Sequence, residues 1–147
     1  MSTIVVGVDG SPGSVRALKF ALDEARVRGD DVTAVAAWHL PAAVYESAWA
    51  PVAVDPQDFE KVAQAALDRS LDEAGAAETG VSVTRLVREG QAADVLVAEA
   101  READLLVVGS RGLGGFKGLL LGSVSQQCVH HAGCPVVIVP NGDRGRA

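Results

Sequence analysis

The sequence predicts an α/β protein with a five-stranded, parallel, doubly wound sheet and helices on both faces. Short aliphatic runs alternate along the chain with segments in which apolar residues recur at helical spacing. The hydrophobic fraction is 48% and the aromatic fraction only 4%, so the core must consist of Val, Leu, Ala and Ile. Strands buried on both faces of a parallel sheet have this composition. A chain of 147 residues is long enough for one substantial core.

The first strand and the first helix have clear boundaries. Residues 3–9, TIVVGVD, form an aliphatic and β-branched run that predicts a buried strand. Apolar residues at helical spacing over residues 14–28 predict the helix that follows. Ser11 before Pro12 is typical of an N-cap with proline at the first helical position, and Gly29 is a suitable C-terminal stop.

The rest of the chain continues the alternation. The predicted strands cover residues 32–38, 81–87, 104–109 and 135–140, and the predicted helices cover residues 58–77, 91–102 and 123–132. Residues 39–56 show no clear periodicity; their Tyr45 and Trp49 either cover a helix, which is the favoured interpretation, or form a partner surface. We expect a single domain over residues 1–147, with residues 1–140 as its core and residues 141–147 as a disordered polar tail.

The order of the elements predicts where a ligand would bind. Alternating strands and helices with right-handed crossovers favour the strand order 3-2-1-4-5. In such a sheet the ligand crevice lies beyond the carboxyl ends of the strands, where the strand order reverses, here between strands one and four. Asp9 ends strand one and Gly109 ends strand four, so the two most unusual loops of the chain would face each other.

Charge and cysteine content exclude several classes of function. The net charge of −6 and a pI near 4.9 argue against non-specific nucleic-acid binding and against an anionic membrane surface. Two cysteines, Cys128 and Cys134, give no disulfide framework and fit a reducing compartment. Neither a signal peptide nor an apolar run of membrane length is recognisable, so we expect a cytoplasmic location.

A glycine-rich stretch, GSRGLGGFKGLLLGS at residues 109–123, holds six glycines beside Arg111 and Lys117. It matches neither the P-loop, because Lys117 follows Phe116, nor the dinucleotide fingerprint, because Lys117 takes the place of the third glycine. It does contain the spacing Gly-x2-Gly-x9-Gly-Ser from residue 109 to residue 123, with the last glycine where a helix begins.

That helix start predicts an anion site. The N–H groups of Ser123, Val124 and Ser125 would point into the crevice, and the hydroxyls of Ser123 and Ser125 would add donors. The alternative is a flexible surface loop with an ordinary serine N-cap. The anion site is the favoured interpretation.

Two distant motifs together resemble the ATP-binding type of the universal stress protein family. The stretch VVGSRGLGGFKGLLLGSVSQQCVHHAGCPVVIVP carries that family's Gly-x2-Gly-x9-Gly-Ser/Thr motif at Gly109, Gly112, Gly122 and Ser123. The opening IVVGVDGSPGSVRALKFAL resembles the same family's first strand and helix, with Asp9 in its usual place. The likeness extends over the whole chain, although residues 39–75 are only loosely patterned.

The resemblance implies a Rossmann-like fold of the adenine nucleotide alpha hydrolase type, with ATP, either alone or with Mg²⁺, in the crevice. It also implies a homodimer formed through the last strand, residues 135–140. Asp9 would approach the adenosine, and the backbone of Ala37 would meet the adenine. The residues expected around the ribose and phosphates are Gly109, Arg111, Gly112, Gly122, Ser123, Val124 and Ser125. This chain departs from the family at Ala36, where members often have histidine, and at Gly133, where a proline is common.

The dimer also follows from the last strand itself. Residues 135–140, PVVIVP, are apolar on both faces and would end the sheet, which leaves unpaired backbone groups along an aliphatic edge. Such an edge promotes aggregation unless it is covered or paired. A two-fold axis would pair it antiparallel with a second copy.

Other constellations carry weaker hypotheses. Cys128, His130, His131 and Cys134 suggest zinc, but no second ligand pair exists elsewhere in the chain, so we expect no metal site. Asp9 without an acidic cluster does not make a receiver-type phosphoacceptor. DGSPGS, residues 9–14, faintly resembles the pyrophosphate loop of adenylating ATP pyrophosphatases but lacks the paired glycines after the serine.

No acid–base pair, no nucleophile beside a histidine and no metal cage converges on the expected phosphates. We therefore expect no catalytic residues and a cytoplasmic, dimeric ATP-binding stress or signalling module with little or no hydrolysis. Its protein partner and inducing stress cannot be read from the sequence. The alternatives are an adenylating or ATP-hydrolysing enzyme and a nucleotide-free dimeric adaptor.

Overall fold

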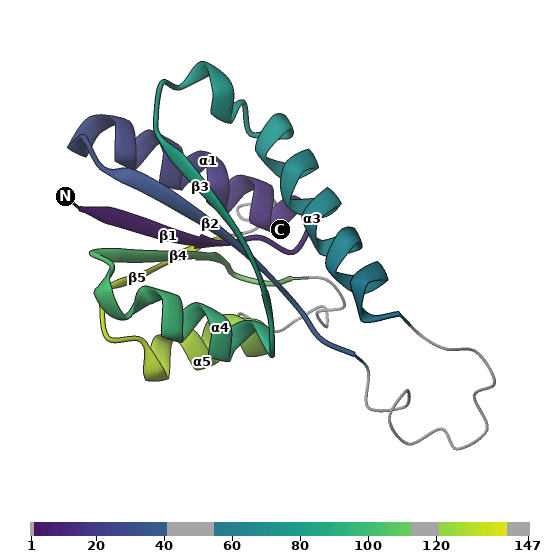
Figure 1. Cartoon of the computed structure of the whole chain (residues 1–147). Helices are drawn as coiled ribbons and strands as arrows, with labels where there is room; N and C mark the ends of the chain where they lie inside the picture. The colour runs from purple at the N-terminus through teal and green to yellow at the C-terminus, as the bar shows by residue number, and fades with distance from the viewer. Residues whose placement is uncertain (1, 41–54, 113–120, 141–147) are drawn as a thin grey trace, which may run out of the picture.

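One all-parallel sheet of five strands forms the centre of the molecule. The computed structural model describes residues 2–40, 55–112 and 121–140. The strand order is β3-β2-β1-β4-β5, which confirms the predicted order (Figure 1). The strands are β1 (Thr3–Gly7), β2 (Asp31–Trp38), β3 (Val83–Glu89), β4 (Leu105–Gly109) and β5 (Val136–Val139). The helices are α1 (Pro12–Arg28), α3 (Pro56–Glu73), α4 (Ala92–Glu99) and α5 (Ser123–His131), with short 3-10 turns η1 (Ala76–Glu78) and η2 (Ala100–Glu102).

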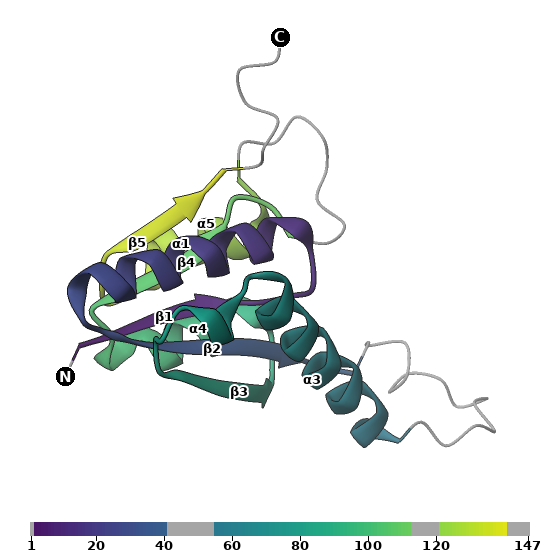
Figure 2. The ribbon, with the colours of Figure 1, turned by 90° about the horizontal axis from the view of Figure 1, so that it is seen from above.

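Helices cover both faces of this sheet. α1 and α3 pack on one face, and α4 and α5 pack on the other (Figures 1 and 2). Successive residues of β1 enter different cores: Ile4 and Val6 join the cluster under α1 and α3, whereas Val5 joins the cluster under α4 and α5. All three side chains are at most 2% exposed. Burial on both faces explains why the strand is continuously aliphatic in sequence.

The predicted cap of α1 is confirmed. The hydroxyl of Ser11 accepts a hydrogen bond from the N–H of Ser14 at 3.2 Å, with proline at the first helical position. Gly29 ends the helix in the left-handed conformation, with a φ of 75°, and its N–H donates to the carbonyl of Ala25. The same chemistry starts α3, where Asp55 accepts from the N–H of Gln57 at 2.9 Å.

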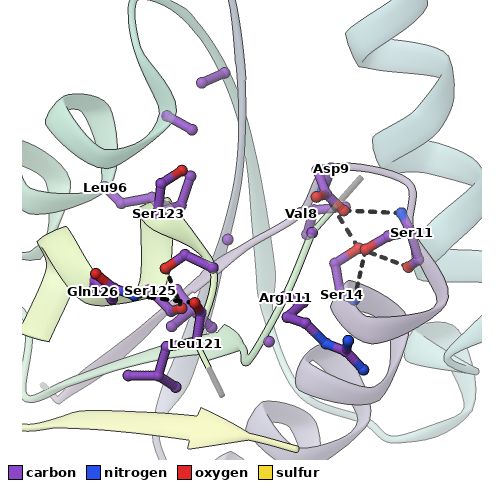
Figure 3. A pocket seen from close by; sticks show the side chains of 18 of the residues that line it. Val8, Asp9, Ser11, Ser14, Leu96, Arg111, Leu121, Ser123, Ser125 and Gln126 are labelled. Carbon is purple, nitrogen blue, oxygen red and sulfur yellow. Dashed lines mark hydrogen bonds between the residues drawn. The ribbon is translucent and has the colours of Figure 1, made fainter. Parts of the chain in front are cut away.

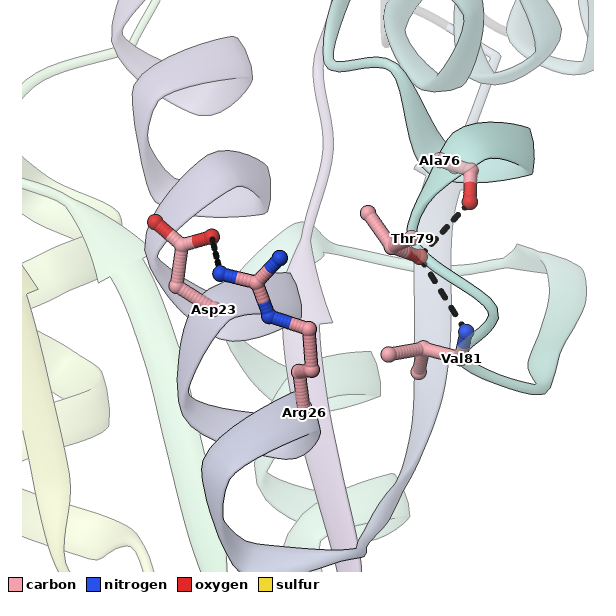
Figure 4. A network of polar contacts seen from close by, with 5 residues as sticks. All are labelled: Asp23, Arg26, Ala76, Thr79 and Val81. Carbon is pink, nitrogen blue, oxygen red and sulfur yellow. Dashed lines mark hydrogen bonds and ion pairs between the residues drawn. The ribbon is translucent and has the colours of Figure 1, made fainter.

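The second predicted helix and the strand after it are shifted along the chain. α3 begins at Pro56 and ends at Glu73, instead of covering residues 58–77, because Gly75 has a φ of 71° and turns the chain into η1. The hydroxyl of Thr79 then donates to the carbonyl of Ala76 at 2.7 Å and accepts from the N–H of Val81 at 3.2 Å (Figure 4). This turn delays the start of β3 from residue 81 to residue 83.

The other boundaries differ by a few residues. β2 starts at residue 31 and β4 at residue 105, β5 covers only residues 136–139, and α4 covers residues 92–99 before it tightens into η2.

Figure 4 also shows an exposed ion pair on α1 between Arg26 and Asp23, at 3.8 Å. Exposed pairs of this kind contribute little to stability.

The first strand ends earlier than predicted, at residue 7 instead of residue 9, and this opens the crevice. β1 pairs with β4 only as far as Val6 with Val107. β4 continues to pair with β5 until Gly109 lies beside Val139. The two central strands therefore part at their carboxyl ends, at the position where the strand order reverses.

Several expectations fall outside the described residues: the polar tail at 141–147, Tyr45, Trp49 and Lys117. In the part of the chain that the structure describes, no helix has both the length and the apolar character needed to cross a membrane.

Candidate functional site

A cavity of about 450 Å³ lies at the carboxyl ends of the central strands (Figure 3). This volume is in the usual range for small-molecule sites. All nine residues that the sequence analysis expected at a ligand site line it. They are Asp9, Ala37, Gly109, Arg111, Gly112, Gly122, Ser123, Val124 and Ser125. Residues from four separate segments of the chain thus meet at one cavity.

The cavity has two polar sides. The loop after β1, with Asp9 and Ser11, forms one side, and the start of α5, with Ser123, forms the other (Figure 3). Arg111 lies between them in the same view. The sequence analysis did not assign the remaining lining residues to the site; they are mostly apolar and come from the strand ends, from α4 and from the starts of α1 and α5. They are Gly7, Val8, Ser11, Ser14, Val35, Ala92, Leu96, Val108, Leu121 and Gln126.

The start of α5 has no side-chain cap. Its N-cap residue is Gly122, which has no side chain to accept a hydrogen bond from the first turn. The carbonyl of Gly122 accepts from the N–H of Gln126 at 3.0 Å, as in a regular helix start. Ser123 and Val124, the first two residues of the helix, line the cavity. An uncapped helix N-terminus at a cavity wall is suited to an anion, because its first N–H groups and the helix dipole both favour negative charge.

The hydroxyl of Ser125 is used differently from what the sequence predicts. Ser125 is only 2% exposed, and its Oγ lies 3.0 Å from the carbonyl oxygens of both Ser110 and Gly122. The hydroxyl therefore donates to the backbone of the protein, and the expectation that it adds a donor to the ligand is wrong for this structure. The side chain of Ser123, by contrast, is exposed.

Ser110 is the junction that holds the start of α5 in place. Its N–H donates to the carbonyl of Val139 at 2.9 Å, and its own carbonyl accepts from the N–H of Gly122 at 2.7 Å. The side-chain amide of Gln126 donates to the carbonyl of Leu121 at 3.1 Å, which joins α5 to the residue before its N-cap position (Figure 3). Because Ser110 directly follows β4, the helix start is fixed to the sheet.

The loop after β1 is ordered by its own short hydrogen bonds (Figure 3). Oδ1 of Asp9 accepts from the N–H of Ser11 at 2.9 Å, and the N–H of Asp9 donates to the hydroxyl of Ser14 at 3.3 Å. That hydroxyl donates in turn to the carbonyl of Ser11 at 3.0 Å. Asp9 is therefore held against the first turn of α1.

The structure gives the zinc interpretation no support. Cys128 is fully buried, and burial raises the pKa of its thiol to about 11. Among the described residues, no three His, Cys, Asp or Glu side chains lie close enough together to hold a metal ion.

A parallel, doubly wound α/β protein with a ligand cavity at its switch point is the class that this fold and site define. Comparison with known families makes the assignment more specific. The model of the universal stress protein family matches residues 1–140, and the chain belongs to this family.

Relatives agree with this assignment. The chain is similar to a universal stress protein of Mycobacterium tuberculosis (strain CDC 1551 / Oshkosh), with 42% identity over 139 residues that cover 92% of this chain and 44% of that protein. It spans less than half the length of the curated relatives it matches. Among solved structures, it resembles a universal stress protein in complex with cAMP, with 33% identity, a TM-score of 0.65 and coverage of 94% of this chain and 95% of that one. It also resembles a universal stress protein family protein from Arabidopsis thaliana with AMP bound, with 25% identity, a TM-score of 0.62 and coverage of 100% and 97%.

Proposed function

We propose that the protein binds an adenine nucleotide, with ATP as the expected ligand, in the cavity between the Asp9 loop and α5. In this proposal residues 1–140 act as one domain of a cytoplasmic stress-response or signalling module that hydrolyses ATP slowly or not at all. The observation that carries the proposal is the uncapped start of α5 at Gly122, which lines the same cavity as Asp9 and Ala37. The relatives solved with cAMP and with AMP support an adenine nucleotide as the ligand class.

The two ends of the cavity suit the two ends of a nucleotide. The phosphates would accept hydrogen bonds from the N–H groups of Ser123 and Val124, with Arg111 as a nearby cation. The base would lie against the apolar part of the lining, which includes Val35 and Leu96, with the backbone of Ala37 at the end of β2 beside it. Asp9 lies across the cavity from Ser123 (Figure 3).

The described lining residues offer little for hydrolysis. Asp9 is the one carboxylate among them, and they include no histidine. One oxygen of Asp9 already accepts from the N–H of Ser11. A Mg²⁺ ion prefers several oxygen ligands, and Asp9 could supply one side chain at most, so we expect any Mg²⁺ to be held mainly by the phosphates. An ATP-binding module fits these residues better than a hydrolase does.

We also propose a homodimer through β5. The carbonyls of Pro135 and Val139 accept from N–H groups at the β4 side of the sheet, those of Leu106 and Ser110. In a parallel ladder the alternate residues, Val136 and Ile138, then direct their backbone groups outward, toward the open edge.

The two edges of the sheet differ in charge, which supports this interface. At the opposite edge, β3 carries exposed Arg85, paired with Asp68 at 2.6 Å, and Arg88, paired with Glu99 at 3.2 Å. Charged side chains on an edge strand discourage pairing with another chain. β5 has none, because its residues are Val, Val, Ile and Val. Of the two edges, β5 is therefore the one that we expect to pair with a second copy.

Nucleotide that copurifies with the protein tests the proposed function. The purified protein is denatured, and the released small molecules are identified by ultraviolet spectrum and mass spectrometry. Adenine nucleotide at up to one equivalent per chain, absent from a Gly122→Val variant prepared in parallel, would support the proposal. If neither the extract nor added ATP yields bound nucleotide, the nucleotide-free adaptor becomes the better account. Recovery of ADP or AMP from added ATP within seconds would favour the enzyme instead.

A further inference from the structure

We infer that Asp9 is a positioning residue that couples the loop after β1 to the loop after β4. We also infer that residue 112 must be glycine because the Asp9 side chain occupies the space that a Cβ would need. The consequence for nucleotide affinity rests on the proposed function. The consequence for the free protein does not.

The local geometry at Gly112 leads to this inference. A Cβ built on Gly112 would overlap Oδ2 of Asp9 and would lie 3.6 Å from its Cγ. Within the described part of the chain, Asp9 supplies the atoms that such a Cβ would meet. The φ of Gly112 is not in the left-handed region, unlike that of Gly10, at 85°. The backbone conformation at Gly112 would therefore accept alanine. Among the described residues, the steric conflict of an added Cβ is with Asp9 alone.

Asp9 cannot move aside without cost. Its other carboxylate oxygen, Oδ1, accepts from the N–H of Ser11 at 2.9 Å, and its own N–H donates to Ser14. Ser11 and Ser14 are 4% and 5% exposed and belong to the start of α1. The side chain is short, so a rotation that clears Oδ2 from Gly112 also removes Oδ1 from Ser11.

The alternative response, a shift of the loop after β4, would reach the phosphate end of the cavity. Gly112 is two residues after Ser110, whose carbonyl holds the N–H of Gly122. Displacing this loop would therefore displace the start of α5. In either case, the contact between Asp9 and Gly112 sets how the two sides of the cavity face each other.

Gly109 provides a matched control. It lies at the end of β4, just before the same loop, and the space beside it is filled by α1 and not by Asp9. A Cβ on Gly109 would lie 3.1 Å from both the carbonyl carbon and the carbonyl oxygen of Gly13 in α1. Here the neighbour is backbone, which a change at Asp9 does not remove. The effect of Gly109→Ala should therefore be the same whatever residue stands at position 9.

A set of double-mutant cycles tests the coupling. Gly112→Ala is made in wild-type, Asp9→Asn and Asp9→Ala backgrounds, and the folding equilibrium constant is measured by denaturant titration without nucleotide. Asparagine fills the same space as aspartate, whereas alanine vacates it. We expect Gly112→Ala to lower the constant at least tenfold in the wild-type and Asp9→Asn backgrounds, and less than threefold in the Asp9→Ala background. Gly109→Ala should lower the folding equilibrium constant by the same factor in all three backgrounds. Asp9→Ser, which keeps an acceptor for Ser11, replaces Asp9→Ala if that variant does not fold.

A second readout is the ATP association constant, measured by calorimetry on the same variants. Gly112→Ala should lower this constant tenfold or more in the wild-type background. The loss should be smaller when residue 9 is alanine or serine. An equal loss in every background, or no loss in the wild type, would overturn the inference. If no variant and not even the wild type binds ATP, the proposed function fails, while the unfolding measurements still decide whether Asp9 and Gly112 are coupled.

Discussion

The hydroxyl of Ser125 reaches the backbone carbonyl of Ser110 at 3.0 Å, across 15 positions of the sequence. Both residues are nearly buried, at 2% and 7% exposure. The same carbonyl accepts from the N–H of Gly122, the residue at the N-cap position of α5. Ser125 therefore supports the helix start at which we propose the phosphates bind, whereas the side chain of Ser123 is exposed.

Replacing Ser125 with alanine should affect stability and nucleotide binding together. The loss of the hydroxyl, which is shared between the carbonyls of Ser110 and Gly122, should lower the free energy of unfolding by about 1 kcal/mol. The loosened start of α5 should also weaken ATP binding several-fold. Denaturant titration and calorimetry measure the two effects. Ser123→Ala is the control: it should weaken ATP binding with little change in stability, because the Ser123 side chain is exposed. If Ser125→Ala left both quantities unchanged, the supporting role would be wrong.

Gly122 should tolerate alanine but not valine. Its backbone is extended, with a φ of −76°, so any residue can adopt it. A Cβ there would lie 3.4 Å from Cα of Arg111 and 3.6 Å from the carbonyl oxygen of Ser110, which is ordinary contact. The two γ carbons of valine would extend further, into either that backbone or the cavity.

We therefore expect Gly122→Ala to bind ATP within about threefold of the wild type, and Gly122→Val to lose about a hundredfold, near 2.8 kcal/mol. Circular dichroism should show the same fold for both variants. Unchanged affinity in a folded Gly122→Val protein would refute the placement of phosphates at this helix start.

Local sequence signals predicted most of this fold, and contacts between distant segments account for what they missed. Ser11 before Pro12 marks the start of α1, and Gly29 marks its end, because caps are decided by neighbouring residues. Asp55 before Pro56 is the same signal for α3 and could have been used to place that helix start.

The site was predicted as a set of residues but not as a set of contacts. The strand order and the glycine spacing predicted that Asp9, Gly109 and the start of α5 would meet, and the family resemblance supplied the rest of the nine residues that line the cavity. No local pattern shows that the hydroxyl of Ser125 would turn toward Ser110, since that bond depends on how closely β4 approaches α5. The sequence analysis also missed that Leu96 lines the cavity. The position of Leu96 depends on how closely α4 packs on Gly7: a Cβ added to Gly7 would lie 2.7 Å from Cδ1 of Leu96.

The β5 edge should be blocked by proline without loss of the sheet. Ile138→Pro removes an N–H that we expect to point outward, so the pairing of β5 with β4 should survive. Light scattering should show a dimer for the wild type and a monomer for Ile138→Pro.

Ile138→Ala is the matched control, since it also removes the side chain, which packs against the core under α4 and α5, but keeps the N–H. It should remain dimeric, although less stable. A monomeric wild type, or a proline variant that is still dimeric, would contradict the proposed interface.

Turnover should be slow. The described lining residues lack a general base in reach of the expected phosphates, so we expect ATP hydrolysis far below the enzyme median of about 10 per second. Phosphate release measured under saturating ATP tests this. A rate of about one per second or more that Arg111→Ala abolishes would assign the protein to the enzymes and end the description as a binding module.

The most direct test of the central claim is a calorimetric titration of nucleotide-free protein with ATP. Binding between the uncapped start of α5 and the Asp9 loop predicts one ATP per chain with a micromolar dissociation constant, about −8 kcal/mol. Adenosine, which lacks the phosphates, should bind far more weakly. Absence of binding at millimolar ATP, or equal affinity for ATP and adenosine, would contradict the assignment of this cavity as a nucleotide site with the phosphates at α5.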